Sequence, residues 1–337
     1  MAARFDQIRE VTEMLFSRKI VFIGLLIIIF TNLAFTNWPV SSGPAAFPPD
    51  RQESLFVNGQ VRSYLLHLPP ITYTLAAKLP LVIALHGGGG APEGMERITG
   101  LSELADREGF AVCYPRGLNG HWNDGRETIE NGPDDVAFIR QLIATLIKDN
   151  HIDPIRVYAT GISNGGMMAE RLGCEMADLI AAIAPVAATM PQNLLTSCQP
   201  ARPLSVLQIH GTLDPLIPYH GGEAPAGRLG QGGRVASIND TVRFWVNFDK
   251  ARKTSSPPIP TTGVNDGTQV VVTLYESRKR TADPFTTEVE LITVVGGGHT
   301  WPGGLQYLPA RIIGRTSRQF NASAKIWEFF TKHPLKP

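Results

Sequence analysis

Ser163 stands between two glycines in the stretch "TGISNGGMM" (160–168), which is a setting typical of a nucleophilic serine. The apolar run "IRVYATG" (155–161) precedes it and predicts a strand, while "NGGMMAERLGCE" (164–175) follows and predicts a helix. At a G-x-S-x-G junction between strand and helix, the sharp turn exposes the serine oxygen, and the helix directs its positive N-terminal end at the site. The alternative is an ordinary serine in a glycine-rich loop. The strand–turn–helix context favours the nucleophile.

A serine nucleophile needs a base and an acid, and His299 and Asp214 have the types and the order for these roles. His299 ends the predicted strand "VELITVVGGGH" (289–299), and Asp214 follows the predicted strand that ends in "QIHG". The order serine, aspartate, histidine along the chain is that of α/β-hydrolases. A carboxylate at position 214 can accept a hydrogen bond from imidazole Nδ1–H and stabilise the imidazolium. The alternative for Asp214 is a turn residue, since it precedes proline.

Other histidines and carboxylates have simpler explanations. His86 and His210 lie inside "LHGG" and "IHGT", where we expect them to brace the turns at strand ends by hydrogen bonds. Asp134 and Asp135 precede the predicted nucleophile and suit the first turn of the amphipathic helix 133–149, where carboxylates oppose the helix dipole. These four residues are therefore not expected to exchange protons in a reaction.

The glycine run "HGGGG" (86–90) follows the apolar strand "LVIAL" and predicts an oxyanion site. Glycines let main-chain N–H groups approach a negatively charged oxygen closely. We assign one donor to the Gly87–Gly89 stretch, at Gly88, and the second to the N–H of Asn164. A phosphate-binding glycine loop is the alternative, but no Lys-Ser/Thr pair follows it. The predicted chemistry requires neither a metal nor an organic cofactor.

The elements that must position these groups alternate between strands and helices. Such alternation predicts an α/β fold with a mostly parallel central sheet and helices on both faces, in which ligands bind beyond the carboxyl ends of the strands. Asn58-Gly59 within "LFVNGQVRSYLLHLP" (55–69) predicts a β-hairpin before this sheet. Residues 95–109 have helical spacing, and 220–234 reads as a mobile loop. Further segments follow the same alternation: strands at 81–85, 110–115, 179–187 and 204–211, and helices at 237–248 and 323–333.

The chain begins with a segment that predicts export. Residues 20–35 form an uncharged apolar run directly after Arg18 and Lys19, typical of a signal or a membrane anchor. We expect a signal or anchor segment at 1–36, a spacer rich in Pro, Ser and Gly at 37–53, and a catalytic domain at 54–337. The domain would face outward on a membrane anchor, or be secreted or periplasmic if the segment is cleaved. A net charge of +1 gives no reason to expect nucleic acid as a partner.

The chain has three cysteines, at positions 113, 174 and 198. None of them has the spacing of a zinc site. Cys113 lies in an apolar run and reads as a core residue. Cys174 and Cys198 would form a disulfide in an oxidising compartment, or remain two free thiols otherwise. The sequence leaves these two alternatives open.

Several long stretches together resemble one family of esterases. The stretches are "LVIALHGGGG", "LADREGFAVCYPRG", "HWNDGR", "DDVAFIRQLI", "YATGISNGGMMAERLGCEMAD", "SVLQIHGTLDPLIPYHGG" and "GGGHTWPGG". They resemble polyhydroxybutyrate depolymerases and related feruloyl and acetylxylan esterases, over residues 55 to 334. The resemblance implies an α/β-hydrolase fold, with Ser163 as nucleophile, Asp214 as acid and His299 as base.

The resemblance also carries expectations about substrate and pocket. It implies hydrolysis of a carboxylic ester of the hydroxyalkanoate, feruloyl or acetyl type through an acyl-enzyme. It suggests that Trp122 and Trp301 wall the acyl pocket, with plain hydrophobic packing as the alternative. Two other functions remain open on the sequence. One is transfer of the acyl group to a membrane or cell-envelope acceptor. The other is a non-catalytic binding module, which the presence of all three predicted catalytic residues disfavours.

Overall fold

The structure is a computed structural model that describes residues 50–70, 77–129, 132–227, 230–256, 258–277 and 286–335. These residues belong to one compact unit, Phe47–Pro337. The predicted membrane-targeting run 20–35 lies outside the described residues. None of the helices in the described ranges is long and apolar enough to cross a membrane. The first strand begins at Arg51, within the stretch predicted as a spacer.

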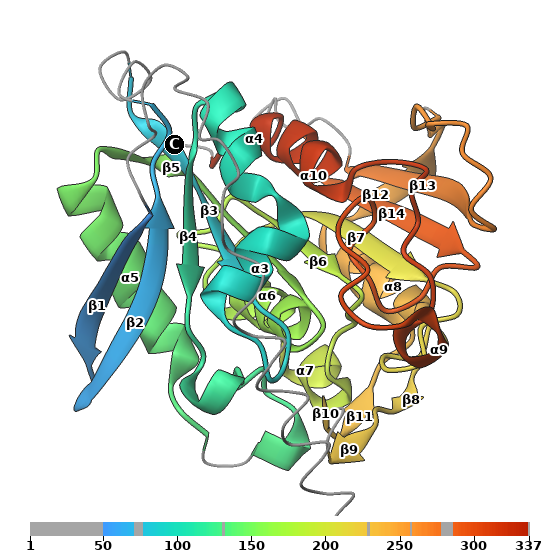
Figure 1. The fold of residues 1–337 in the computed structure, drawn as a ribbon, viewed down its shortest axis with the longest axis horizontal. Helices are drawn as coiled ribbons and strands as arrows, with labels where there is room; N and C mark the ends of the chain where they lie inside the picture. The colour runs from blue at the N-terminus through green and yellow to red at the C-terminus, as the bar shows by residue number, and fades with distance from the viewer. Residues whose placement is uncertain are drawn as a thin grey trace, which may run out of the picture. The chain divides into compact units, whose positions relative to one another are not determined.

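A ten-stranded sheet forms the centre of the described part of the chain (Figure 1). The strand order is β1-β2-β4-β3-β5-β6-β7-β14-β13-β12. The strands from β4 to β14 in this order are parallel, whereas β1, β2, β13 and β12 pair antiparallel at the two edges. The strand bounds are β1 Arg51–Val57, β2 Gln60–His67, β3 Leu79–Leu85, β4 Ala111–Pro115, β5 Ile152–Ile162, β6 Ala182–Val186, β7 Ser205–Gly211, β12 Ala251–Thr254, β13 Gln269–Ser277 and β14 Glu288–Val295.

Helices cover both faces of this sheet (Figure 1). Alternate residues of β3 divide between the two sides: Leu81 and Ile83 pack in the core beneath α5, α6 and α8, and Val82 packs beneath α3, α4 and α10. The helix bounds are α3 Pro92–Thr99, α4 Leu101–Glu108, α5 Asp135–Asp149, α6 Asn164–Glu175, α7 Gln192–Ser197, α8 Ile238–Phe248, α9 Ala310–Ile313 and α10 Ala322–Thr331. The predicted α/β architecture, with a mostly parallel sheet buried on both faces, is confirmed.

Two local predictions depended on glycines. Asn58 and Gly59 adopt φ angles of 50° and 80° and connect β1 to β2, so the predicted hairpin is confirmed. The helical pattern at 95–109 is not one helix, because Gly100 adopts φ 60° and separates α3 from α4. Its N–H donates to the carbonyl of Glu96 at 2.8 Å, which ends α3.

The structure differs from the sequence prediction at the last strands. The antiparallel extension β12–β13 was not predicted: β12 has four residues, and β13 is largely half-exposed at the edge of the sheet. The segment predicted as a mobile loop at 220–234 contains two short antiparallel pairs, β8 (Gly222–Glu223) with β11 (Arg234–Val235) and β9 (Ala226–Gly227) with β10 (Gly230–Gln231). Two-residue strands are too short to show a periodic pattern.

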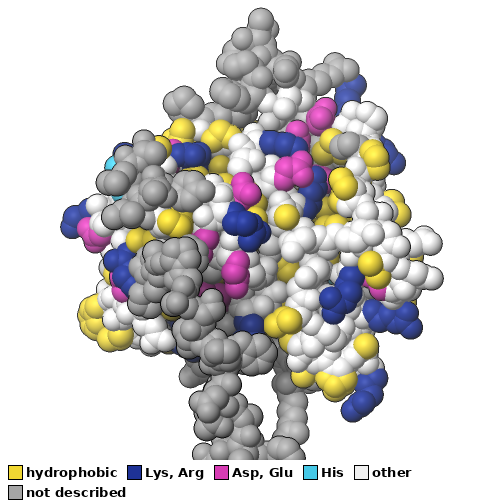
Figure 2. All heavy atoms as spheres, turned by 45° about the horizontal axis from the view of Figure 1, so that its top comes forward, with side chains coloured by type: hydrophobic (Ala, Val, Ile, Leu, Met, Phe, Trp, Pro, Cys, Tyr) yellow, Lys and Arg dark blue, Asp and Glu magenta, His cyan; other side chains and the backbone are white. Residues whose placement is uncertain are grey.

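The surface carries charges of both signs. Figure 2 shows basic and acidic side chains interspersed with scattered hydrophobic ones on the face that it draws. This distribution agrees with the net charge of +1. The described residues on this face therefore present no extended basic surface of the kind that binds nucleic acid.

Candidate active site

Ser163 occupies a strained turn between β5 and α6. Its backbone has φ 58° and ψ −125°, a region that residues with a Cβ atom rarely adopt. Its N–H donates to the carbonyl of Val186 at 3.0 Å, which fixes the turn against β6. Gly165 must be glycine here, because a Cβ atom would collide with the main-chain carbonyls of Leu85 and His86. The sequence therefore predicted the strand–turn–helix geometry correctly, and the strained conformation is of the kind found at functional sites.

His299 lies in the loop after β14, because that strand ends at Val295 rather than at position 299. The imidazole Nδ1 is 2.8 Å from Asp214 Oδ2, and both side chains are buried. The main chain around His299 is also fixed: its N–H donates to the carbonyl of Ile313 at 2.6 Å, and its carbonyl accepts from the Tyr307 hydroxyl at 2.9 Å. The structure thus brings together the histidine and the aspartate that the sequence singled out.

The Asp214 carboxylate is held in its ionised form. Its Oδ1 accepts hydrogen bonds from the N–H groups of Leu216 and Ile217, both at 2.8 Å. Burial alone would raise the pKa of Asp214, but His299, His210 and the Ile217 N–H together outweigh burial, so this pKa lies below its usual value. An ionised, buried carboxylate at Nδ1 orients the imidazole and stabilises its protonated form.

His86 and His210 make the bracing contacts expected of them. His86 Nδ1 contacts the carbonyl of Gly87 at 2.8 Å, and its Nε2 accepts from the N–H of Gly117 at 3.0 Å. Burial lowers the pKa of His86 to about 4, so this imidazole is neutral at pH 7. His210 contacts the carbonyls of Ala188 and Ile217, and burial lowers its pKa as well. Both rings therefore fix loops rather than exchange protons.

The other two carboxylates considered for the acid role, Asp134 and Asp135, lie at the start of α5, as predicted. Asp134 caps the helix, since its side chain accepts from the N–H of Ala137 at 2.9 Å. Asp135 lies in the first turn and forms a buried ion pair with Arg62. Neither carboxylate lines the cavity described next.

Ser163 and His299 line the same cavity, which has a volume of about 340 Å³. Gly88 and Asn164 line it too, so the structure brings the predicted nucleophile, base and oxyanion residues together. Most of the remaining lining is apolar and comes from α3, from the loop after Asp214 and from the segment after His299: Met95, Ile98, Leu216, Ile217, Tyr307, Leu308 and Ile313. A cavity of this size and character suits a small organic molecule.

The main-chain N–H groups of Gly88 and Asn164 line the cavity and have no partner elsewhere in the described residues. In the glycine loop, Gly89 N–H donates to the carbonyl of Gly120 at 2.8 Å and Gly90 N–H to that of Gly87 at 3.0 Å. Gly88 N–H, like that of Gly87, has no such acceptor among the described residues. Neither has Asn164 N–H, which opens α6, where the first N–H groups lack intrahelical acceptors. These two free donors are the ones that the sequence suggested for an oxyanion.

Trp122 and Trp301 do not line the cavity, which corrects the expectation that they wall the acyl pocket. Both indoles are fully buried. Trp122 Nε1 donates to the carbonyl of His86 at 2.9 Å, and Trp301 Nε1 donates to Ser323 Oγ at 3.0 Å. Both tryptophans instead pack in the hydrophobic cores on the two sides of the sheet, Trp122 on one side and Trp301 on the other.

The sequence reasoning missed a buried ion pair beside the cavity. Arg126 lines the cavity and forms hydrogen bonds of 3.0 Å from Nε to both carboxylate oxygens of Asp124. Its other nitrogens reach the Gly232 carbonyl at 2.6 Å and Gln231 Oε1 at 3.3 Å. Arg126 thereby fastens the 222–235 segment to the site. The only signal for it in the sequence was the pair of opposite charges in "HWNDGR".

One group of side chains within the described residues could hold a metal ion: Asp50, His67 and Glu96. None of the three lines the cavity. His67 contacts Asp50 Oδ1 at 2.7 Å through Nδ1 and Asp106 Oδ1 at 3.0 Å through Nε2. Hydrogen bonds between these side chains account for their arrangement.

Known proteins that resemble this chain are esterases. The family model described as "Esterase PHB depolymerase" matches residues 62–190. The putative esterase NocK of Nocardia uniformis subsp. tsuyamanensis is 36% identical over 304 residues, which cover 86% of this chain and 85% of that protein. Feruloyl esterase B of Piromyces equi is 31% identical over 238 residues, covering 68% of this chain but 41% of that protein.

Solved structures agree on the fold. The acetyl xylan esterase from Aspergillus awamori superposes with a TM-score of 0.52 at 17% identity, over 84% of this chain and 99% of that one. At this identity the likeness shows the fold alone, which is that of the α/β-hydrolases. The matches in sequence carry the activity. The chain therefore belongs to the esterase family of the PHB depolymerase type, and it is a carboxylic ester hydrolase with an α/β-hydrolase fold.

Proposed function

We propose that this esterase works through Ser163, His299 and Asp214, with a covalent acyl-enzyme on the serine. The observation that carries the proposal is the 2.8 Å contact between His299 Nδ1 and Asp214 Oδ2, beside a cavity that His299 shares with the strained Ser163. The aspartate occupies Nδ1, which leaves Nε2 for a proton from serine. The order of the three residues along the chain is the one expected for this fold.

In the first half of the reaction, His299 Nε2 takes the proton from Ser163 Oγ as the oxygen attacks the ester carbonyl. The carbonyl oxygen becomes an oxyanion, which the N–H groups of Gly88 and Asn164 stabilise. When the tetrahedral intermediate collapses, the bond from the carbonyl carbon to the alcohol oxygen breaks. His299 gives its proton to the leaving alcohol, and the acyl group remains on Ser163 as an ester.

In the second half, water replaces the alcohol. His299 takes a proton from water as its oxygen attacks the acyl-enzyme, and the same two N–H groups stabilise the new oxyanion. Collapse breaks the bond between the carbonyl carbon and Ser163 Oγ, and His299 returns the proton to the serine. The products are a carboxylic acid and an alcohol, so hydrolysis balances without any further reactant.

The cavity favours an ester with an apolar part. Its lining is largely aliphatic, and one of the lining side chains, Leu308, is also exposed to solvent. Water-exposed apolar side chains beside a cavity favour apolar ligands. We propose short alkanoyl, hydroxyalkanoyl or feruloyl esters as substrates, in agreement with the names of the feruloyl and acetyl xylan esterases that it resembles.

We also propose that the catalytic domain acts outside the cytoplasm. The structure joins Cys174 to Cys198 in a disulfide, which resolves the alternative that the sequence left open. Disulfides persist in oxidising compartments and are rare in the cytosol. The bond therefore supports the export that the apolar segment 20–35 predicts.

The test is hydrolysis of p-nitrophenyl butyrate by a Ser163→Ala variant, with release of free butyric acid measured separately. We expect kcat to fall by roughly 10⁴-fold or more, because the nucleophile is lost while the fold is kept. Ser54→Ala is the matched control, since Ser54 is exposed on β1 and is expected to leave kcat unchanged. A folded Ser163→Ala variant with undiminished kcat would overturn the proposal.

A further inference from the structure

His121 is a polar side chain in the cavity whose role the proposed mechanism leaves open. It lies in the loop between β4 and α5 and lines the cavity together with Ser163. Its Nδ1 atom is buried and has no hydrogen-bond partner among the described residues. A buried polar atom without a partner destabilises the fold, so such an atom in a folded protein calls for an explanation.

The backbone of His121 is fixed to the residue that follows the predicted nucleophile. Trp122 N–H donates to Asn164 Oδ1 at 2.8 Å, and Asn164 Nδ2 donates to the Trp122 carbonyl at 3.0 Å. His121 N–H donates to the Leu118 carbonyl at 3.0 Å and closes a short turn. These contacts hold the imidazole in place relative to the first turn of α6.

The free Nδ1 atom lies beside the main-chain donors proposed for the oxyanion. A Cβ atom placed on Gly88 would be 3.2 Å from His121 Nδ1 and 3.7 Å from Asn164 Cβ. The imidazole and Asn164 therefore both lie close to the side of Gly88 on which a Cβ atom would stand. The hydrogen bond from Gly89 N–H to the Gly120 carbonyl, at 2.8 Å, ties the glycine loop to the residue before His121. His121, Gly88 and Asn164 thus lie next to one another, and all three line the cavity.

We propose that His121 Nδ1–H is a third hydrogen-bond donor to the carbonyl oxygen of the ester. The inference rests on the proposed roles of Gly88 and Asn164. A neutral imidazole carries its proton on either nitrogen. A lone pair on Nδ1 would repel the negative oxygen that develops in the transition state, so the reaction selects the Nδ1–H form. The bond strengthens as charge develops, and it therefore lowers the barrier more than it tightens binding of the ester.

His86 shows why a histidine as such is not sufficient for this role. Its two ring nitrogens are occupied by Gly87 and Gly117, so it has no donor left for a ligand. His121, in contrast, has an atom that is buried, unpartnered and next to the glycine loop. The two rings therefore differ in their hydrogen bonds: both ring nitrogens of His86 have partners, whereas Nδ1 of His121 has none among the described residues.

The test compares substitutions of His121 that differ in where, or whether, they place an N–H donor in the cavity. In His121→Asn the amide can place an N–H near the position of Nδ1, whereas in His121→Gln it lies nearer to Nε2, and His121→Phe has no donor. With p-nitrophenyl acetate, which has no hydroxyl group on its acyl part, we expect kcat to fall roughly 10- to 100-fold in the Phe and Gln variants. We expect KM to change less than kcat, and the Asn variant to keep most of its kcat.

His220→Phe is the matched control, since His220 is an exposed histidine outside the cavity lining and its loss is expected to leave kcat unchanged. Thermal melting of each variant reports on folding. Equal kcat values in folded Asn and Gln variants would overturn the inference, as would a Phe variant with the kcat of the unmodified enzyme. Neither result would restore activity to Ser163→Ala, so failure of this inference is distinct from failure of the proposed nucleophile.

Discussion

The two ends of helix α6 have different roles in the molecule. At its N-terminal end the chain is strained and open: Ser163 adopts a positive φ, and the N–H of Asn164 has no acceptor among the described residues. Gly165 brings the helix so close to β3 that main-chain carbonyls occupy the space of a Cβ atom. This end keeps hydrogen-bonding capacity free for a ligand.

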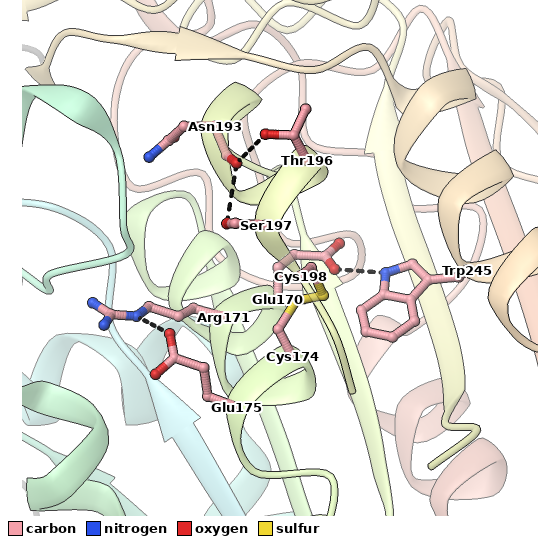
Figure 3. Close-up of a disulfide and its surroundings, with 9 residues drawn as sticks. All are labelled: Glu170, Arg171, Cys174, Glu175, Asn193, Thr196, Ser197, Cys198 and Trp245. Carbon is pink, nitrogen blue, oxygen red and sulfur yellow. Dashed lines mark hydrogen bonds and ion pairs between the residues drawn. A yellow bond between two sulfur atoms is a disulfide. The ribbon is translucent and has the colours of Figure 1, made fainter. Parts of the chain in front are cut away.

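At its C-terminal end the same helix is tied to its neighbours (Figure 3). Cys174 forms a disulfide with Cys198, which follows α7. Glu170 Oε2 accepts a hydrogen bond of 2.8 Å from Trp245 Nε1 on α8, whereas the ion pair of Arg171 with Glu175, at 2.7 Å, lies within α6 itself. Its side chains are used to hold α6, α7 and α8 together.

The comparison teaches that the strain at Ser163 is held by contacts at its own end of α6, separately from the anchoring at the other end. Residues held in sparsely populated backbone regions persist only where the surrounding structure constrains them. At Ser163 these constraints are the hydrogen bond to Val186 and the close contact of Gly165 with Leu85 and His86, whereas the disulfide and the Glu170–Trp245 bond lie towards the other end of the helix. Substitutions at the N-terminal end should therefore change kcat, and those at the C-terminal end should change stability alone.

The largest effect is expected from Gly165→Ala. The new methyl group would meet the carbonyls of Leu85 and His86, which are main-chain atoms of β3 and the glycine loop and cannot rotate away. The turn at Ser163 and the donor at Asn164 would have to shift. We expect kcat for p-nitrophenyl butyrate to fall 100-fold or more, a loss of the order seen when an oxyanion donor is removed. Unchanged kinetics would show that the close approach at this end is unnecessary.

The next effect comes from the Glu170 carboxyl group, whose titration makes the free energy of unfolding depend on pH. Burial raises the pKa of Glu170 from its ordinary value of 4.5 to about 8, and the Trp245 hydrogen bond opposes this only in part. Between these two values the folded protein holds a proton that the unfolded chain releases. Stability therefore decreases as the pH rises from 4.5 to about 8, by up to roughly 1.4 kcal/mol per pH unit.

Glu170→Gln removes this titration and keeps an acceptor for Trp245. We expect the free energy of unfolding of the variant to equal that of the unmodified protein near pH 4.5 and to exceed it increasingly up to pH 8. Urea denaturation across this range measures the difference. Glu175→Gln controls for the loss of a carboxylate from the same end of the helix, because Glu175 pairs with Arg171 at the surface. Parallel pH curves for the unmodified protein and Glu170→Gln would contradict the prediction.

The two ends of α6 also differ in how far the sequence predicted them. The serine turn was predictable because glycines, strand and helix are neighbours in the chain, so local rules apply. His299 and Asp214 were found from their order relative to Ser163. The partnership of Glu170 with Trp245 was not predicted, because the two are 75 residues apart and meet only through the packing of α6 against α8.

The pocket shows a second limit of sequence reasoning. Trp122 and Trp301 stand next to residues of the site in the chain, yet their rings point into the core. Adjacency along a loop does not fix the direction of a side chain. His121 illustrates the converse, since its neighbour Trp122 is the one that sequence reasoning selected for the pocket, whereas His121 lines the cavity.

A smaller effect is expected from removing the disulfide. The double substitution Cys174→Ala and Cys198→Ala opens a loop between positions 24 apart in the chain. Greater freedom of the unfolded chain should reduce the free energy of unfolding by about 3 kcal/mol. We expect kcat at 25 °C to stay the same, because neither cysteine lines the cavity. As a control, reductant should destabilise the unmodified protein but not the double variant. A loss of kcat in the folded double variant would contradict the prediction that the C-terminal end of α6 affects stability alone.

The smallest effect is expected from Gly173→Ala, which repeats the Gly165 substitution at the opposite end of the helix. A methyl group here would lie 2.8 Å from Ile183 Cδ1 and 3.2 Å from Trp245 Cη2, which are the ends of side chains rather than backbone. Repacking costs about 1–3 kcal/mol, and replacing glycine by alanine within a helix returns up to about 1 kcal/mol. We expect the free energy of unfolding, measured in urea, to fall by about 1 kcal/mol and kcat to stay unchanged. This result would show that α6 tolerates a methyl group at its C-terminal end, where side chains surround the glycine. A loss of kcat as large as that of Gly165→Ala would show instead that strain at Ser163 extends along the whole of α6.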